Sequence, residues 1–175
     1  AVPINVGMIN NDGYNALILR KNKEAMHAFW IQLMVNAEIA KGYRLKDMPN
    51  EWFVIPSDEA MKNAIVSVVG VFACNRLMDE GKYEEADNLM KHIMDIESGI
   101  VDLHRKLLVC DRMFCEIIGE NRREGIDEMY TDKQKSCMKT MKKFPTVLRT
   151  EYAYALCVER NEEKEIIEFL KNKNI

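Results

Sequence analysis

The sequence contains little that would end or interrupt a helix, with only eight glycines and four prolines among its 175 residues. Alternation of apolar and polar residues, which is typical of β-strands, is essentially absent. Long segments instead carry apolar residues at helical spacing. We therefore expect an all-α protein, and the length is that of about one domain.

The sequence also lacks the common motifs of catalysis. It contains no H-E-x-x-H, no nucleophile elbow, no Walker loop and no dinucleotide-binding fingerprint. Its three histidines, His27, His92 and His104, are far apart along the chain, and each lies in a helical pattern. We assign no catalytic residue, expect no cofactor in this chain alone, and predict that it is not an enzyme by itself.

Neither sign of charge dominates, because 25 Lys and Arg stand against 28 Asp and Glu, for a net charge of −3. This mildly acidic balance gives no electrostatic reason to expect a nucleic-acid partner. The most basic stretch places five lysines between Lys133 and Lys143. Such a run is typical of a solvated helix face, and the alternative is a patch that contacts anionic lipid headgroups.

The five cysteines are odd in number and are never spaced as C-x-x-C. All lie in apolar helical patterns, which indicates buried reduced thiols and a cytoplasmic protein. The longest apolar stretch, Ala64–Cys74, is far shorter than the roughly 20 residues that span a bilayer. The cysteines are Cys74, Cys110, Cys115, Cys137 and Cys157.

Seven helices are predicted from apolar spacing and from start and stop signals. Asn22 is the expected N-cap of the first and Ser57 of the second, while Thr131 and Gln134 have the spacing of a capping box for the fifth. Apolar residues wrap most of the way around the first helix, so we expect it to be largely buried. The predicted helices cover about residues 22–41, 57–80, 83–96, 100–118, 132–144, 146–160 and 162–173.

The predicted turns recur at similar intervals along the chain. Gly42, Gly81, Gly119 and about Arg160 mark equivalent places, with offsets of 39, 38 and 41 residues. A weak repeat of this length, with two helices in each unit, is typical of an α-solenoid. In such a fold each helix pair buries its apolar face only by stacking on its neighbours.

One of these turns has a more specific pattern. The segment "GKYEEADNLMKHI" resembles the junction of a tetratricopeptide repeat, with Gly81, Tyr83 and Ala86 at the glycine, aromatic and small positions. We therefore expect residues 22–175 to form antiparallel helix pairs stacked as a tetratricopeptide-like α-solenoid. An irregular helical bundle is the alternative.

An asparagine recurs at the same place before two of the turn glycines. Asn36 lies six residues before Gly42, and Asn75 lies six residues before Gly81. The first helices of an α-solenoid line its concave face, where an asparagine can bind the backbone of an extended peptide. We predict that Asn36 and Asn75 belong to a groove for a protein or peptide partner. A polar contact within the core, or coincidence, is the alternative reading of this pair.

The first 55 or so residues carry a family resemblance. The segment "AVPINVGMINNDGYNALILRKNKEAMHAFWIQLMVNAEIAKGYRLKDMPNEWF" resembles the one that follows the membrane-embedded core in bacterial site-2 proteases, a family of zinc metallopeptidases. Asp12-Gly13, with Pro3 upstream, looks like the later Asp-Gly motif of that family, whose Asp is a zinc ligand. The resemblance implies that residues 1–21 are a remnant of the metallopeptidase core and that Asp12 binds zinc in a full-length protein.

The same resemblance implies a function for the rest of the chain. It suggests a non-catalytic helical domain, on the cytosolic side of a membrane-embedded zinc metallopeptidase, that binds other proteins or presents substrates. The zinc-binding histidine pair and the glutamate base are absent, so zinc is expected only in a full-length protein. The chain opens Ala1-Val2-Pro3 without Met, and we expect it to be a piece of a longer one. The alternative is a stand-alone structural or regulatory helical-repeat protein, in which Asp12-Gly13 is only a turn.

Overall fold

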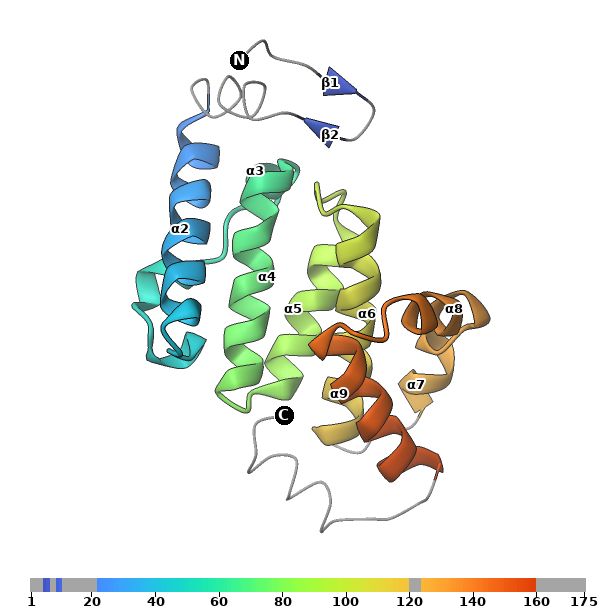
Figure 1. Ribbon diagram of the computed structural model, residues 1–175. Coiled ribbons are helices and arrows are strands. Elements are labelled where there is room, and N and C mark those ends of the chain that lie inside the picture. The colour runs from blue at the N-terminus through green and yellow to red at the C-terminus, as the bar shows by residue number, and fades with distance from the viewer. Residues whose placement is uncertain (1–4, 7–8, 11–21, 120–123, 160–175) are drawn as a thin grey trace.

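The computed structural model describes residues 5–6, 9–10, 22–119 and 124–159 (Figure 1). These residues form an all-α fold, as predicted, apart from a short antiparallel pair of strands, β1 (Asn5–Val6) and β2 (Ile9–Asn10). Two 3₁₀ helices, η1 and η2, lie in the segment between α2 and α3. The other elements are α2 (Lys23–Ala40), η1 (Leu45–Asp47), η2 (Asn50–Phe53), α3 (Asp58–Met61), α4 (Ala64–Asp79), α5 (Tyr83–Asp95), α6 (Asp102–Ile118), α7 (Glu124–Met129), α8 (Asp132–Thr140), α9 (Pro145–Tyr154) and the π-helical turn η3 (Ala155–Glu159).

The longer helices pack in a row that follows the chain. Helix α2 packs on α4, α4 on α5, α5 on α6, and α6 on α9. Figure 1 shows α2 at one end of this row, and α7 and α8 beside α6 and α9 at the other. Each interior helix therefore has a neighbour on two sides, whereas α2 packs mainly on α4 and on the connector between them.

The ends of α2 and α4 confirm the predicted turn glycines. Gly42 and Gly81 have φ angles of 91° and 77°, which only glycine adopts without strain. At both ends the residue after the glycine donates back to the helix, Tyr43 N–H to the Glu38 carbonyl at 3.1 Å and Lys82 N–H to the Leu77 carbonyl at 2.9 Å. Two turns that are 39 residues apart therefore close with the same Schellman motif.

The predicted second helix is in fact two helices. Ser57 caps only the four-residue α3, and the helical conformation is interrupted before Asn63. The Asn63 side chain caps α4, because it accepts hydrogen bonds from backbone N–H groups in the first turn of that helix. Gly99 lies against this break, since its N–H donates to the Met61 carbonyl at 2.8 Å and a Cβ on it would lie 2.4 Å from the Lys62 carbonyl oxygen. The interruption between α3 and α4 is therefore stabilised by the long-range contact with Gly99 as well as by the Asn63 cap.

The expectation that the first helix is largely buried is wrong. Asn22 caps α2 as predicted, but only one side of the helix meets α4 and the connector. Trp30 is 47% exposed and Leu33 is 54% exposed. The buried residues of α2 are small or β-branched: Ala25, Ala28, Ile31 and Val35. The exposed apolar side is Met26, Phe29, Trp30, Leu33 and Ile39.

The second half of the chain departs from the predicted helices in three places. Helix α7 was not predicted, α8 ends at Thr140, and α9 gives way to a π-helical turn. The capping box forms only in part, because Thr131 Oγ1 accepts from the Gln134 N–H at 3.2 Å while the Gln134 side chain donates to the Lys106 carbonyl at 2.9 Å. The predicted helix at 162–173 lies outside the described residues.

Four of the five cysteines are buried, and Cys137 is half-buried. Burial raises the pKa of the Cys74 thiol to about 12, and it raises the pKa of the Cys110 thiol to about 12. Such thiols stay protonated at neutral pH. Within the described part of the chain, none of the helices combines the length and the apolar character that crossing a membrane requires.

Candidate functional site

A groove with a volume of about 490 Å³ opens between the end of α2, the C-terminal half of α4, and helices α6 and α9. Its apolar walls include Ile39, Met78 and Phe114. Its polar groups come from three separate parts of the chain, with Asn75 on α4, Arg44 after α2 and Arg149 on α9. The remaining lining residues are Tyr43, Leu45, Asp79, Tyr83, Pro145 and Thr146.

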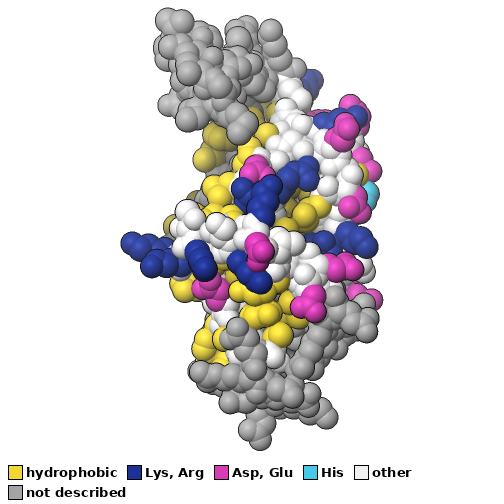
Figure 2. Space-filling view, turned by 90° about the vertical axis from the view of Figure 1, so that its right-hand side faces the viewer, with side chains coloured by type: hydrophobic (Ala, Val, Ile, Leu, Met, Phe, Trp, Pro, Cys, Tyr) yellow, Lys and Arg dark blue, Asp and Glu magenta, His cyan; other side chains and the backbone are white. Residues whose placement is uncertain are grey.

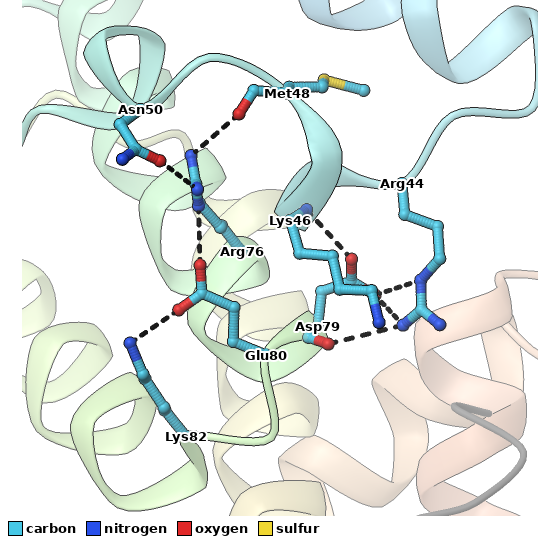
Figure 3. Close-up of polar contacts among 8 residues, drawn as sticks. All are labelled: Arg44, Lys46, Met48, Asn50, Arg76, Asp79, Glu80 and Lys82. Atoms are coloured by element: carbon cyan, nitrogen blue, oxygen red, sulfur yellow. Dashed lines mark hydrogen bonds and ion pairs between the residues drawn. The ribbon is translucent and has the colours of Figure 1, made fainter.

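One wall of the groove is fixed by an ion pair at the end of α4 (Figure 3). Arg44 Nε donates to Asp79 Oδ1 at 2.9 Å, and Arg44 Nη2 also contacts this carboxylate. The other carboxylate oxygen accepts from the Lys46 backbone N–H at 3.1 Å. Asp79 therefore binds both the Arg44 side chain and the backbone of η1, so contacts within the chain itself stabilise this wall of the groove.

A second arginine ties the connector to the same helix. Arg76 Nη1 donates to the Met48 carbonyl at 3.3 Å, Nη2 contacts the Asn50 side chain, and Nε donates to Glu80 Oε1 at 2.8 Å (Figure 3). The guanidinium also lies 4.7 Å from the centroid of the Phe53 ring. Hydrogen bonds from the side chains of Arg76 and Lys82 lower the pKa of Glu80. These contacts keep the connector against α4.

The opposite wall contains a second ion pair, in which Arg149 Nη2 of α9 bonds Asp111 Oδ1 of α6. The Asp111 side chain is buried, and this burial raises the pKa of its carboxyl although Arg149 favours the charged form. The Arg149 guanidinium lies 4.8 Å from the Phe114 ring centroid, and its buried Nε has no hydrogen-bond partner among the described residues. The ring face thus takes the place of an acceptor for Arg149.

The predicted site residues have different positions in the structure. Asn75 is half-buried and lines the groove, whereas Asn36 is exposed on α2 and is not among the lining residues. Both stand six residues before a glycine with the same turn geometry, so their backbone positions are equivalent. Asp12 lies outside the described residues.

Sequence reasoning missed the two arginines of the groove. Arg44 and Arg149 are more than 100 residues apart, and neither has a local pattern that singles it out. The two arginines come to line the same groove only because α9 packs on α6 and the connector packs on α4. The nearest local signal was Asn75, which was predicted from its distance to Gly81.

The histidines show no common site. His27, His92 and His104 are exposed, and His92 Nε2 lies 2.9 Å from Asp58 Oδ1 in a contact between α5 and α3. Among the residues that the structure describes, no three His, Cys, Asp or Glu side chains are grouped as a metal site would require. No family model, curated protein or solved structure matches this chain.

The groove combines hydrogen-bonding groups with apolar surface. The Asn75 amide offers both a donor and an acceptor, and guanidinium groups line two of the walls. Between them, Ile39, Met78 and Phe114 offer contact area for apolar side chains. Extended peptides require this mixture, because their backbone needs hydrogen-bond partners and their side chains need pockets.

Proposed function

We propose that this chain is a non-catalytic helical module that binds an extended segment of a partner protein in the groove between α2, α4, α6 and α9. The observation that carries the proposal is the groove itself, in which one amide and two guanidinium groups stand among apolar side chains. Its walls are braced by the ion pairs of Arg44 with Asp79 and of Arg149 with Asp111. A braced groove loses little entropy on binding.

The helix row supports a tetratricopeptide-like α-solenoid as the architecture behind this function. Sequential helices pack as neighbours, and α2 and α4 end in the same turn. In the first unit, however, the connector with η1, η2 and α3 stands where a second long helix would be expected. An irregular helical bundle therefore remains the alternative architecture.

We further propose that the module belongs to a membrane-embedded zinc metallopeptidase, as the resemblance of the first 55 or so residues implies. In that protein Asp12 would be a zinc ligand, and the histidine pair would lie upstream of this chain. The genomic sequence before the Ala1 codon tests this part. Hydrophobic spans with an H-E-x-x-H motif in the same reading frame support it, and a Met codon directly before Ala1 favours a stand-alone structural or regulatory protein.

Peptide selection tests the binding function directly. The 175-residue chain is used to select from a displayed library of random 12-residue peptides, and each selected peptide is added to ¹⁵N-labelled protein. We expect the amide signals of groove residues, such as Asn75, Met78 and Thr146, to shift on binding. Failure to select any peptide, or shifts confined to residues outside the groove, would contradict the proposal.

A further inference from the structure

The most basic segment of the chain lies where α8 leads into α9. Residues 132–148 contain five lysines and one acidic residue, Asp132, so this segment carries a charge of +4. Since the whole chain carries −3, the remaining residues carry −7. We refer to Lys133, Lys139, Lys142, Lys143, Phe144 and Leu148 as the basic corner.

The lysines of the basic corner are directed to solvent. All four are exposed, and none forms an ion pair with another described residue. The fifth lysine of the segment differs, since Lys135 pairs with Asp132 at 3.7 Å and lies 4.9 Å from the Tyr130 ring centroid. Figure 2 shows Lys and Arg side chains around the middle of this face, where α8 lies, with apolar side chains and several Asp and Glu side chains among them.

The basic corner also exposes two large apolar side chains. Phe144 is 44% exposed at the cap before Pro145, and Leu148 is 52% exposed one turn into α9. The other side of α9 is occupied with the core, because Val147 and Thr150 are buried there. Exposed aromatic and aliphatic side chains, beside lysines that form no ion pair with the described residues, are typical of a surface that lies on a membrane.

We propose that the basic corner docks this protein onto the surface of an anionic lipid bilayer. The lysines would approach lipid phosphates and carboxylates, and Phe144 and Leu148 would enter the boundary between headgroups and acyl chains. Electrostatic attraction of this kind acts within about 10 Å at 0.1 M salt. The net charge of −7 on the remaining residues therefore weakens the attraction little when only the basic corner contacts the bilayer.

Other anionic partners fit this surface less well. Arg149, the arginine that directly follows this segment, is held by Asp111 and Phe114, so its guanidinium is not free for bidentate binding of an acidic peptide. None of the four lysines lines the groove, which could otherwise have enclosed a peptide. A long nucleic acid would pass over the acidic remainder of the chain. Diffuse lysine charge beside apolar side chains suits a planar surface best.

Vesicle co-sedimentation tests the proposal. The 175-residue chain is mixed, at 100 mM salt, with vesicles of phosphatidylcholine alone or with 30% phosphatidylserine. A variant with Lys133, Lys139, Lys142 and Lys143 changed to Gln is compared with a control in which Lys23, Lys46, Lys62 and Lys91 are changed to Gln. Both variants have the same net charge, so they differ in the position of the lost lysines and in the exposed Lys62–Glu59 ion pair that the control removes.

We expect binding to the phosphatidylserine vesicles alone. Each lysine at such a surface contributes about a fivefold change in affinity, so loss of the four at the corner should weaken binding at least about a hundredfold. The control should bind within about fivefold of the unchanged chain. A variant with Phe144→Ser and Leu148→Ser should bind about tenfold more weakly, since it loses most of the apolar contact.

Three outcomes would overturn the proposal. The first is no binding to vesicles with phosphatidylserine, and the second is an equal loss in the control variant. The third is binding of a poly-glutamate peptide through the same four lysines without any binding to vesicles, which would make the corner a site for acidic proteins. Circular dichroism of each variant shows whether it is folded, and none of the substituted side chains is buried.

Discussion

Helices α2 and α6 are similar in length, with 18 and 17 residues, but they lie in different surroundings. Helix α6 lies between α5 and α9 and buries eight residues, whereas α2 packs mainly on α4 and buries four. As a result, α2 leaves five large apolar side chains exposed. The position of a helix in the row, rather than its own count of apolar residues, determines how much of it is buried.

The largest expected difference between the two helices is in core packing. Leu108 of α6 is 1% exposed, and Leu33 of α2 is 54% exposed. Leu108→Ala should lower the free energy of unfolding by about 2–5 kcal/mol, because it removes buried methyl groups and leaves a cavity. Leu33→Ala should change it by less than about 0.5 kcal/mol. Urea unfolding of both variants measures the two values.

A similar loss of unfolding free energy in Leu108→Ala and Leu33→Ala would contradict the difference in burial between α6 and α2. It would mean that the exposed side of α2 is covered in solution. In that case the variant Trp30→Ala, also on the exposed side, should show a comparable loss. A small effect of Trp30→Ala would restrict the covered area to the region around Leu33.

The second expected effect concerns the turns that end α2 and α4. Gly42→Ala and Gly81→Ala each place a Cβ on a residue with positive φ, and in both cases no atom of the other described residues lies within 4 Å of that Cβ. Each change should therefore lower the unfolding free energy by a backbone term alone, about 1–2 kcal/mol. Thermal and urea unfolding measure it. Clearly unequal losses at the two turns would show that they are not equivalent repeats.

The third effect is a pH dependence of the unfolding free energy that arises from Asp111 of α6. Burial raises the pKa of Asp111 above its ordinary value of 3.8, so the folded state binds this proton more tightly than the unfolded state. The contribution of Asp111 to the unfolding free energy is therefore greatest below about pH 4 and declines as the pH rises through the raised pKa.

Comparison with Asp111→Asn isolates this contribution, since the other carboxyl groups are common to both proteins. The unfolding free energy of the unchanged protein, minus that of the variant, should fall as the pH rises above about 4. Urea unfolding at several pH values gives this difference. An increase over the same range would mean that Arg149 outweighs burial at this carboxyl.

The sequence predicted the local features of the fold well. Asn22, Gly42, Gly81 and Thr131 act where local rules place them, because caps and left-handed turns depend on a few adjacent residues. Helical spacing also predicted α5 within one residue of its end at Asp95. These features require no knowledge of the neighbouring helices.

The features that depend on distant residues could not be predicted in this way. The break before Asn63 involves Gly99, and the exposure of α2 depends on how many helices surround it. The groove depends on Arg44 and Arg149, which line the same hollow only because α9 packs on α6 and the connector packs on α4. Asn75 was predicted from the repeat, but its repeat partner Asn36 does not line the groove.

Helices α2 and α6 both contribute to the groove, through Ile39 and Phe114, and a matched pair of variants tests most directly whether it binds a partner. Thr146→Trp fills the groove from α9, whereas Asn36→Trp adds the same side chain to the exposed surface of α2. The affinity of a selected peptide is measured for both by fluorescence anisotropy. We predict at least about a tenfold loss for Thr146→Trp, equivalent to about 1.4 kcal/mol, and no change for Asn36→Trp. Equal affinities for the two variants would contradict the assignment of the groove as the binding site.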